Sequence, residues 1–144
     1  MVTRTSQAEW RGPLADGEGS VKLGSGAFEG RYSFNSRFED GPGTNPEELL
    51  GAAHAACFSM ALSLVLGQAG FAPRRISTSA AVDIERSGEG FAIPRIRLTT
   101  EADVPGIDAA TFTAHAETAK RGCPVSKALA GVEIALVAQL AGAA

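Results

Sequence analysis

Alternating apolar and polar positions predict short strands in the first third of the chain. Between Phe28 and Phe34, aromatic residues alternate with polar ones, a period of two that is typical of a half-buried strand. Clusters of glycine separate this segment from two earlier ones of the same character. The predicted strands are Ala8–Arg11, Ser20–Leu23 and Phe28–Phe34.

A polar segment and a long helix are predicted next. Residues 35–44 are rich in glycine and proline, which predicts an irregular loop. Asn45 is a good helix cap and Pro46 suits the first helical position, and the two glutamates that follow complement the positive end of a helix. Gly67 or Gly70 can end this helix.

The predicted helix is unusually apolar. No formally charged residue occurs between Leu49 and Pro73, which is long enough to suggest a membrane span. Many of its residues are small, however, including glycine, alanine, serine and cysteine. We therefore expect the buried central helix of a globular protein, and no membrane.

The second half of the chain predicts further strands and two more helices. Alternation predicts two strands that pair antiparallel, Asp108 caps an amphipathic helix, and Pro124 opens a short helix. The order of elements is βββ, α, ββ, αα, β, which indicates an α+β fold with antiparallel sheets around the central helix. The predicted segments are Ala80–Glu85, Arg95–Glu101, a helix after Asp108, Val125–Ala130 and Val132–Leu140.

Composition narrows the class of protein. The 144 residues suit a single domain over the whole chain, residues 1–144. A net charge of −3 disfavours a nucleic-acid partner. The first ten residues lack the apolar core of a secretory signal, so a cytoplasmic location is expected. Two cysteines cannot build a disulfide scaffold.

Those two cysteines are the first candidates for chemistry. Cys57 lies within the central helix, and Cys123 lies directly before Pro124 at a helix start. They can form a redox couple, contribute to a metal site or simply pack as small apolar residues. Backbone N–H groups at a helix start lower a thiol pKa, which favours the Cys123 thiolate. The uncharged interior of the predicted helix desolvates a thiolate, which raises the pKa of Cys57 unless a cation lies nearby.

Two other residue types could assist a thiol. Arg37, in the loop rich in glycine and proline, is the best candidate cation for Cys57, although it can equally be a solvated loop arginine. His54 lies three residues before Cys57, so a Cys-His dyad or a zinc site with Cys123 is conceivable. A packed or capping role for His54 is favoured, because neither cysteine belongs to a close metal-type pair.

Four segments resemble the OsmC/Ohr family of thiol-dependent organic hydroperoxide reductases, and its OsmC branch more than its Ohr branch. The resemblance covers nearly the whole chain and implies an intertwined homodimer with active sites at the subunit interface. It also implies a peroxidase of oxidative and osmotic stress, recycled by a dithiol such as a dihydrolipoyl protein, with no cofactor or metal. The four segments are Asn35–Glu39, Gly43–Met60, Val104–Asp108 and Gly122–Ser126.

The resemblance also assigns roles to individual residues. Cys57 matches the peroxidatic cysteine, Cys123 the resolving cysteine, Arg37 the active-site arginine, and Glu47 the acidic partner that holds it. Glu47 and Cys57 are ten residues apart on one predicted helix, which corresponds to about 15 Å of helical rise. If Glu47 and Arg37 serve Cys57, we therefore expect them to come from the other chain.

Two further functions remain open at the level of sequence. A general disulfide oxidoreductase would also use two thiols, although the chain has no Cys-x-x-Cys motif. A non-catalytic module that binds an apolar ligand would keep both cysteines as structural residues. Reaction of the thiols with peroxide distinguishes the peroxidase from both alternatives.

Overall fold

The computed structural model describes residues 1–142 and divides the chain into two compact units, Met1–Leu49 and Leu50–Ala144.

The first unit contains an antiparallel three-stranded sheet in the order β1-β2-β3, in agreement with the predicted strands. Trp10 and Tyr32 stack across this sheet with their ring centroids 5.4 Å apart. Gly19 lies between them in the register, and a Cβ atom there would collide with both rings, so the stack requires glycine. The strands are β1 (Ser6–Arg11), β2 (Glu18–Leu23) and β3 (Glu29–Tyr32).

The prediction of an irregular loop over residues 35–44 is wrong at its start, where helix α1 (Phe34–Phe38) forms. Ser33 caps this helix: its side chain accepts a hydrogen bond from the Ser36 N–H, and the Ser36 hydroxyl accepts one from the Ser33 N–H. This reciprocal pair is a capping box with serine in place of the usual glutamate. One helical turn is thereby stabilised within a polar segment.

Helix α2 (Pro46–Gln68) begins and ends as the sequence predicts. The Asn45 side-chain oxygen accepts a hydrogen bond of 2.7 Å from the Glu48 N–H. At the other end, Gly70 has a φ of +90°, which a glycine adopts without strain. The Phe71 N–H then closes the last turn on the carbonyl of Leu66.

The sheet of the second unit combines antiparallel and parallel pairing. The antiparallel pairing of β4 (Arg75–Val82) with β7 (Arg95–Asp103) confirms the predicted pairing, although β4 begins five residues before the predicted Ala80–Glu85 and ends at Val82. Strand β8 (Glu133–Leu140) lies parallel to β7, which corrects the expectation of purely antiparallel sheets. Parallel neighbours require a long crossover, and helices α3 (Ala109–Gly122) and α4 (Pro124–Ala128) supply it.

A small hairpin was not predicted. Strands β5 (Glu85–Ser87) and β6 (Gly90–Ala92) pair antiparallel, and Gly88 in the turn has a φ of +59°. Its residues are mostly exposed and show no apolar alternation, so the pattern gave no signal of a strand pair.

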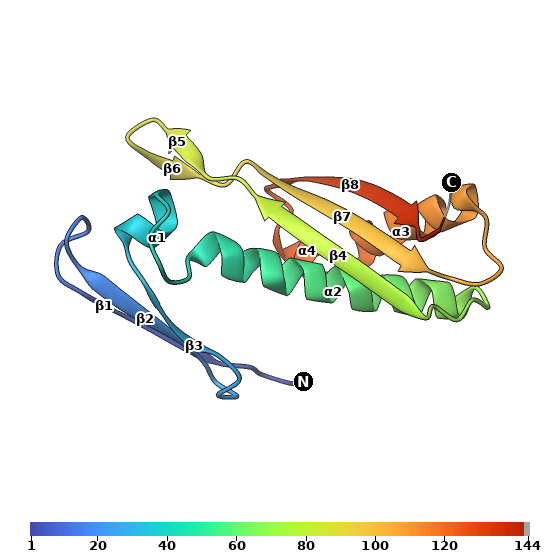
Figure 1. Ribbon diagram of the computed structural model, residues 1–144, viewed down its shortest axis with the longest axis horizontal. Coiled ribbons are helices and arrows are strands. Elements are labelled where there is room, and N and C mark those ends of the chain that lie inside the picture. The colour runs from blue at the N-terminus through green and yellow to red at the C-terminus, as the bar shows by residue number, and fades with distance from the viewer. Residues whose placement is uncertain (143–144) are drawn as a thin grey trace. The chain divides into compact units, whose positions relative to one another are not determined.

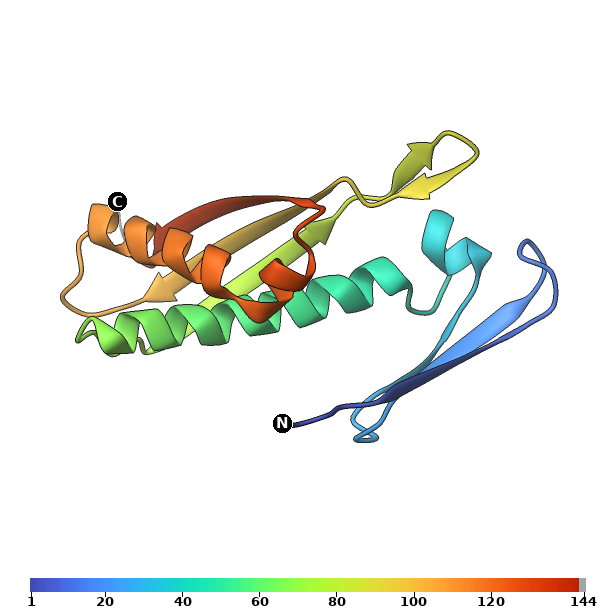
Figure 2. The same cartoon turned by 180° about the vertical axis from the view of Figure 1, so that it is seen from behind.

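The hydrophobic core lies between one face of the β4-β7-β8 sheet and the helices (Figures 1 and 2). Alternate residues of β7 are buried against α2 and α3, while the intervening residues point to the open face. This alternation is that of a sheet covered on one side. The core residues from α2, β7 and α3 are Phe58, Leu62, Leu66, Ile96, Leu98, Ala102, Phe112, Ala116 and Ala119.

Helix α2 is only partly buried in the single chain, which differs from the expectation of a buried central helix. Phe58 and Leu62 are fully buried, whereas Met60 and Leu64 on another side are 76% and 62% exposed. By length and composition α2 could cross a membrane, a test that the core helix of a globular protein also passes. Because α2 contributes Phe58, Leu62 and Leu66 to the hydrophobic core, its apolar character is that of a core helix.

Candidate active site

The structure brings the two cysteines together. Cys57 is half-buried on α2, and Cys123 is fully buried where α3 ends and α4 begins. Both thiols are free, and they form a hydrogen bond with each other. The two thiols are therefore neighbours in the fold, as a disulfide between them would require.

The start of α4 surrounds the Cys123 sulfur with hydrogen-bond donors. Cys123 is the residue before Pro124, which occupies the first helical position and has no N–H. The Cys123 side chain forms no regular cap at this helix start, but the backbone N–H groups of Val125 and Ser126 and the Ser126 hydroxyl lie close enough to its sulfur to lower the pKa of the thiol. These donors would stabilise a thiolate at Cys123.

The two thiols have opposite pKa shifts. Burial is the main cause that raises the pKa of Cys57, and the hydrogen bond with Cys123 adds to the rise. Burial would also raise the pKa of Cys123, but the hydrogen bonds from Cys57, Ser126 and Val125 together lower it below the ordinary value of a thiol. Within this chain, Cys123 is the thiol that ionises more readily.

His54 lies behind this pair. Its side chain is fully buried, and Nε2 lies 2.8 Å from the Ser126 hydroxyl oxygen. Burial lowers the pKa of His54, which keeps the imidazole neutral near pH 7. The sequence did not single out Ser126; its position three residues after Cys123, where a side chain reaches back to the helix start, was the available signal.

Arg37 and Glu47 form a second pair, in the first unit. The Arg37 Nε and one terminal nitrogen both donate to Glu47 Oε1, at 3.0 and 2.7 Å. The Glu47 side chain is 7% exposed and that of Arg37 35% exposed, so the carboxylate holds the guanidinium at the surface. The guanidinium carbon also lies 5.3 Å from the centre of the Phe38 ring. Arg37 is thereby fixed in place by α1 and the first turn of α2.

The four predicted site residues thus form two pairs, one in each unit. Arg37 contacts Glu47 in the first unit, and Cys57 contacts Cys123 in the second. Among the described residues, no group of three or more histidine, cysteine or acidic side chains could hold a metal ion. His54 is connected to Cys123 through the Ser126 hydroxyl, which interacts with both side chains.

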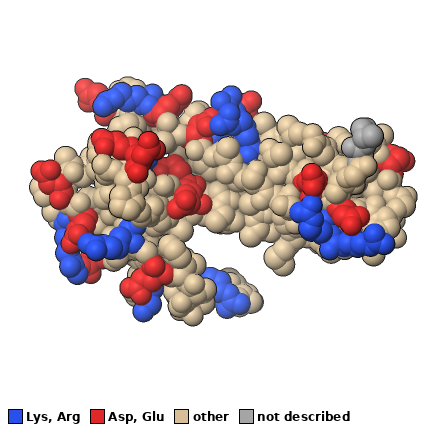
Figure 3. All heavy atoms as spheres, viewed as in Figure 1, with Lys and Arg blue, Asp and Glu red and all other residues tan. Residues whose placement is uncertain are grey.

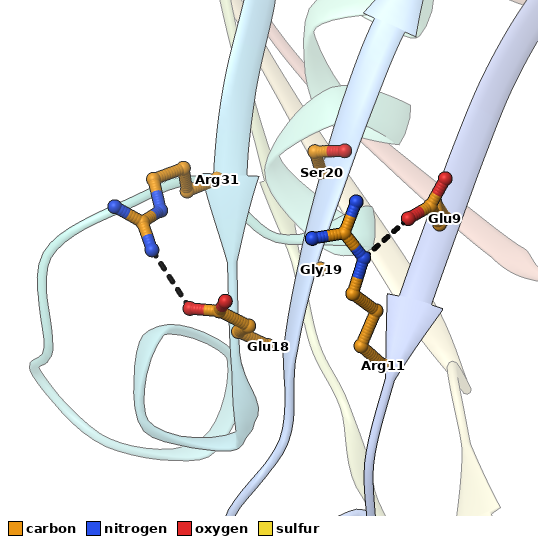
Figure 4. A pocket seen from close by; sticks show the side chains of 6 residues that line it. All are labelled: Glu9, Arg11, Glu18, Gly19, Ser20 and Arg31. Carbon is orange, nitrogen blue, oxygen red and sulfur yellow. Dashed lines mark hydrogen bonds and ion pairs between the residues drawn. The ribbon is translucent and has the colours of Figure 1, made fainter.

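A hollow on the first unit is lined by charged side chains of the three-stranded sheet (Figure 4). Its two guanidinium groups are already paired with carboxylates, Arg11 with Glu9 and Arg31 with Glu18. These pairs are exposed and therefore weak, and the hollow offers no nucleophile besides the hydroxyl of Ser20. On the face shown in Figure 3, acidic and basic side chains lie beside one another. The chemistry of this chain is concentrated at the thiol pair.

A half-exposed thiol in contact with a buried, hydrogen-bonded one is typical of proteins that cycle between a dithiol and a disulfide. Comparison with known proteins supports this class. A family model described as OsmC-like protein matches residues 39–137. Peroxiredoxin OsmC of Escherichia coli strain K12 is 53% identical over 140 residues, which cover 96% of this chain and 97% of that protein. The chain belongs to the OsmC-like protein family.

The chain is also similar to two proteins named organic hydroperoxide resistance proteins. The organic hydroperoxide resistance protein of Xanthomonas axonopodis pathovar citri is 37% identical over 93 residues, 63% of each protein. The crystal structure of the organic hydroperoxide resistance protein OhrB of Bacillus subtilis has a TM-score of 0.71 at 25% identity, and covers 94% of this chain and 97% of that one. The resemblance inferred from four sequence segments is confirmed, as is the α+β fold with a central helix.

Proposed function

We propose that this chain, a peroxidase by its family and its relatives, reduces organic hydroperoxides to alcohols through Cys57 and Cys123. The observation that carries the proposal is the hydrogen-bonded pair of free thiols, one half-exposed and one buried. Cys57 is the partly exposed residue of the pair and is therefore the one that a substrate reaches, whereas Cys123 is fully buried and is in contact with Cys57. The apolar side chains that pack around the two cysteines favour an alkyl or aryl hydroperoxide over hydrogen peroxide as the substrate.

The reaction has three steps. The Cys57 thiolate attacks the distal oxygen of the hydroperoxide, which gives a sulfenic acid and an alkoxide that takes a proton to become the alcohol. The Cys123 thiolate then attacks the Cys57 sulfur and displaces hydroxide, which leaves as water once protonated. A dithiol, such as a dihydrolipoyl protein, reduces the resulting disulfide and is itself oxidised to a disulfide.

Cys57 needs a cation to act first. Because burial raises its pKa and Cys123 ionises more readily, the single chain alone would place the charge on the wrong sulfur. We propose that Arg37, held by Glu47, supplies the positive charge that favours the Cys57 thiolate and stabilises the leaving alkoxide. Its two donated hydrogen bonds to Glu47 prevent the guanidinium from rotating away.

We propose further that Arg37 and Glu47 reach Cys57 from the partner in an intertwined homodimer, which functions as one domain per chain. Ten residues of α2 separate Glu47 from Cys57, a helical rise of about 15 Å that excludes contact within one straight helix. Two features favour a second copy. Apolar side chains of α2 such as Met60 are exposed, and among the described residues the β1-β2-β3 unit buries no apolar side chain.

The substrate, the dithiol, the cytoplasmic location and the role in stress are parts of the same proposal. The names of the relatives support the hydroperoxide substrate. The dithiol and the role in stress rest on the resemblance to the family, and the cytoplasmic location is a prediction from the sequence. No cofactor or metal enters the mechanism.

Intact-mass analysis tests the proposed reaction. Purified protein is treated with stoichiometric cumene hydroperoxide under non-reducing conditions, beside the variants Cys57→Ser and Cys123→Ser. We expect the wild type to lose two hydrogens, Cys123→Ser to retain an added oxygen on Cys57, and Cys57→Ser to show no fast reaction. If neither cysteine reacts faster than a free thiol, the peroxidase proposal fails and the module that binds an apolar ligand takes its place.

A further inference from the structure

The proposed reaction does not use His54, a buried side chain that is connected to the thiol pair through Ser126. His54 has no exposed surface, and its Nε2 lies 2.8 Å from the hydroxyl of Ser126, which in turn bonds to the Cys123 sulfur. The other ring nitrogen, Nδ1, is buried and has no hydrogen-bond partner among the described residues. A buried polar ring with only one partner is costly, which points to a function for the contact that it does make.

The unpartnered nitrogen determines where the protons of this chain of hydrogen bonds lie. A buried N–H without an acceptor is rarer in proteins than a buried lone pair without a donor. We therefore assign the proton of the neutral imidazole to Nε2, which donates it to the Ser126 oxygen. The single proton of the Ser126 hydroxyl is then free to be donated to the Cys123 sulfur.

We propose that His54 is a positioning residue, which holds the Ser126 hydroxyl so that its proton points at the Cys123 sulfur. A serine inside a helix otherwise donates its proton to a backbone carbonyl three or four residues earlier. Donation from the His54 Nε2–H to the oxygen fixes the hydroxyl in the other orientation. Ser126 can then donate to a thiolate throughout the reaction cycle.

This inference rests on the proposed function and deepens it at the resolving step. Attack by the Cys123 thiolate on the Cys57 sulfenic acid forms the S–S bond, breaks the S–O bond and releases hydroxide. When the disulfide is reduced, a thiolate of the external dithiol attacks the sulfur of the partly exposed Cys57, and the electron pair of the S–S bond returns to Cys123. Because a thiolate of lower pKa leaves faster, the Ser126 hydroxyl assists this second step as well.

The test measures the ionisation of Cys123 without any peroxide. In a Cys57→Ser background, Cys123 is the one remaining thiol, and its ultraviolet thiolate absorbance is titrated against pH. His54→Leu removes the donor, and we expect it to raise the pKa of Cys123 by about 1. His54→Gln keeps an N–H donor on a side chain of similar reach, and we expect it to restore most of the difference. His115→Gln changes the other histidine and serves as the matched control.

Kinetics provide the second readout, with Cys57 restored. A rise of about 1 in the pKa of Cys123 lowers the thiolate fraction tenfold, partly offset by greater nucleophilicity, so formation of the Cys57–Cys123 disulfide should slow about threefold in His54→Leu. Oxidation of Cys57 to the sulfenic acid should keep its rate. Far-UV circular dichroism and the thermal midpoint verify that each variant is folded.

Several outcomes would overturn the assignment, and they differ from those that would overturn the peroxidase. Equal pKa values of Cys123 in wild type and His54→Leu, or an equal rise in His54→Leu and His54→Gln, mean that the donor at position 54 does not act. Should His54→Leu fail to fold, Ser126→Ala replaces it, and an unchanged pKa of Cys123 there contradicts the proposal. The titration keeps its meaning even where no hydroperoxide is reduced.

Discussion

At the scale of single residues, the thiol pair shows how burial and local donors compete. Burial disfavours the thiolate at both residues, yet the pKa of Cys57 rises and that of Cys123 falls. The hydrogen bond between the two thiols lowers the pKa of Cys123 and raises that of Cys57, and the backbone N–H groups and the Ser126 hydroxyl at the start of α4 lower the pKa of Cys123 further. The sequence predicted this ranking from two features, the helix start that Pro124 marks after Cys123 and the uncharged helix interior around Cys57.

The buried His54 should make stability depend on pH. Its pKa lies below the ordinary value of about 6.5, so the folded chain prefers the neutral ring while the unfolded chain takes up a proton. This contribution to stability is present above about pH 6.5 and is lost as the pH falls through the unfolded value toward the folded one. The expected slope reaches at most about 1.4 kcal/mol per pH unit.

Urea unfolding between pH 7 and pH 5 measures this effect. Carboxylates contribute to the same curve, so the comparison is with His54→Gln, which lacks the ionisable ring but keeps a donor toward Ser126. We expect the free energy of unfolding of the wild type to fall more steeply than that of His54→Gln. Parallel curves for the two proteins would show that the ring does not titrate differently on folding.

At the scale of elements, the contribution of the α1 cap to stability can be tested directly. Ser33 accepts the hydrogen bond from the Ser36 N–H that caps this short helix, and α1 carries Arg37. Ser33→Ala removes the cap and should lower the free energy of unfolding by about 1 kcal/mol. Ser33→Thr retains a hydroxyl and should lose less than half as much. A chemical denaturation series tests this, and an equal loss in both variants would contradict a capping role.

How far the elements could be predicted depends on where their signals lie in the sequence. Helix α2 was predicted at both ends because its cap, Asn45, and its terminating glycine, Gly70, act locally. Helix α1 was missed because serine replaces the usual acidic residue of the capping box. The parallel pairing of β8 with β7 was missed because pairing direction is decided by the crossover and not by the strand's own pattern.

The candidate site was predictable to a similar degree. Cys57 and Cys123 stood out as reactive residue types, and the resemblance to the family assigned Arg37 and Glu47. That the two cysteines meet could not be derived from their separation of 66 positions, since it requires α4 to pack against α2. Ser126 was missed because a serine at a helix start has a capping explanation that needs no further role.

At the scale of the whole molecule, the exposure of α2 is best understood as the property of a single chain. The sequence predicts a helix without charged residues after Glu48, but it does not show which chain buries each side of that helix. One side carries core residues such as Phe58, and another exposes Met60 and Leu64. A second copy that covered this side would bury apolar area and, in the proposed dimer, would bring Arg37 to Cys57.

Mixed dimers test whether Arg37 acts across the interface. Arg37→Met and Cys57→Ser, each inactive alone, are unfolded together in equal amounts and refolded. Random association makes about half of the dimers mixed. In an intertwined mixed dimer, one of the two sites combines the intact Cys57 of one chain with the intact Arg37 of the other. About a quarter of all chains should then form the Cys57–Cys123 disulfide rapidly, as counted by intact mass after cumene hydroperoxide. The matched control mixes Cys57→Ser with Cys123→Ser, and because the structure places both cysteines in one chain, no mixed dimer can form that disulfide. If the first mixture is as inactive as the control, Arg37 serves the cysteine of its own chain, and the intertwined site must be abandoned.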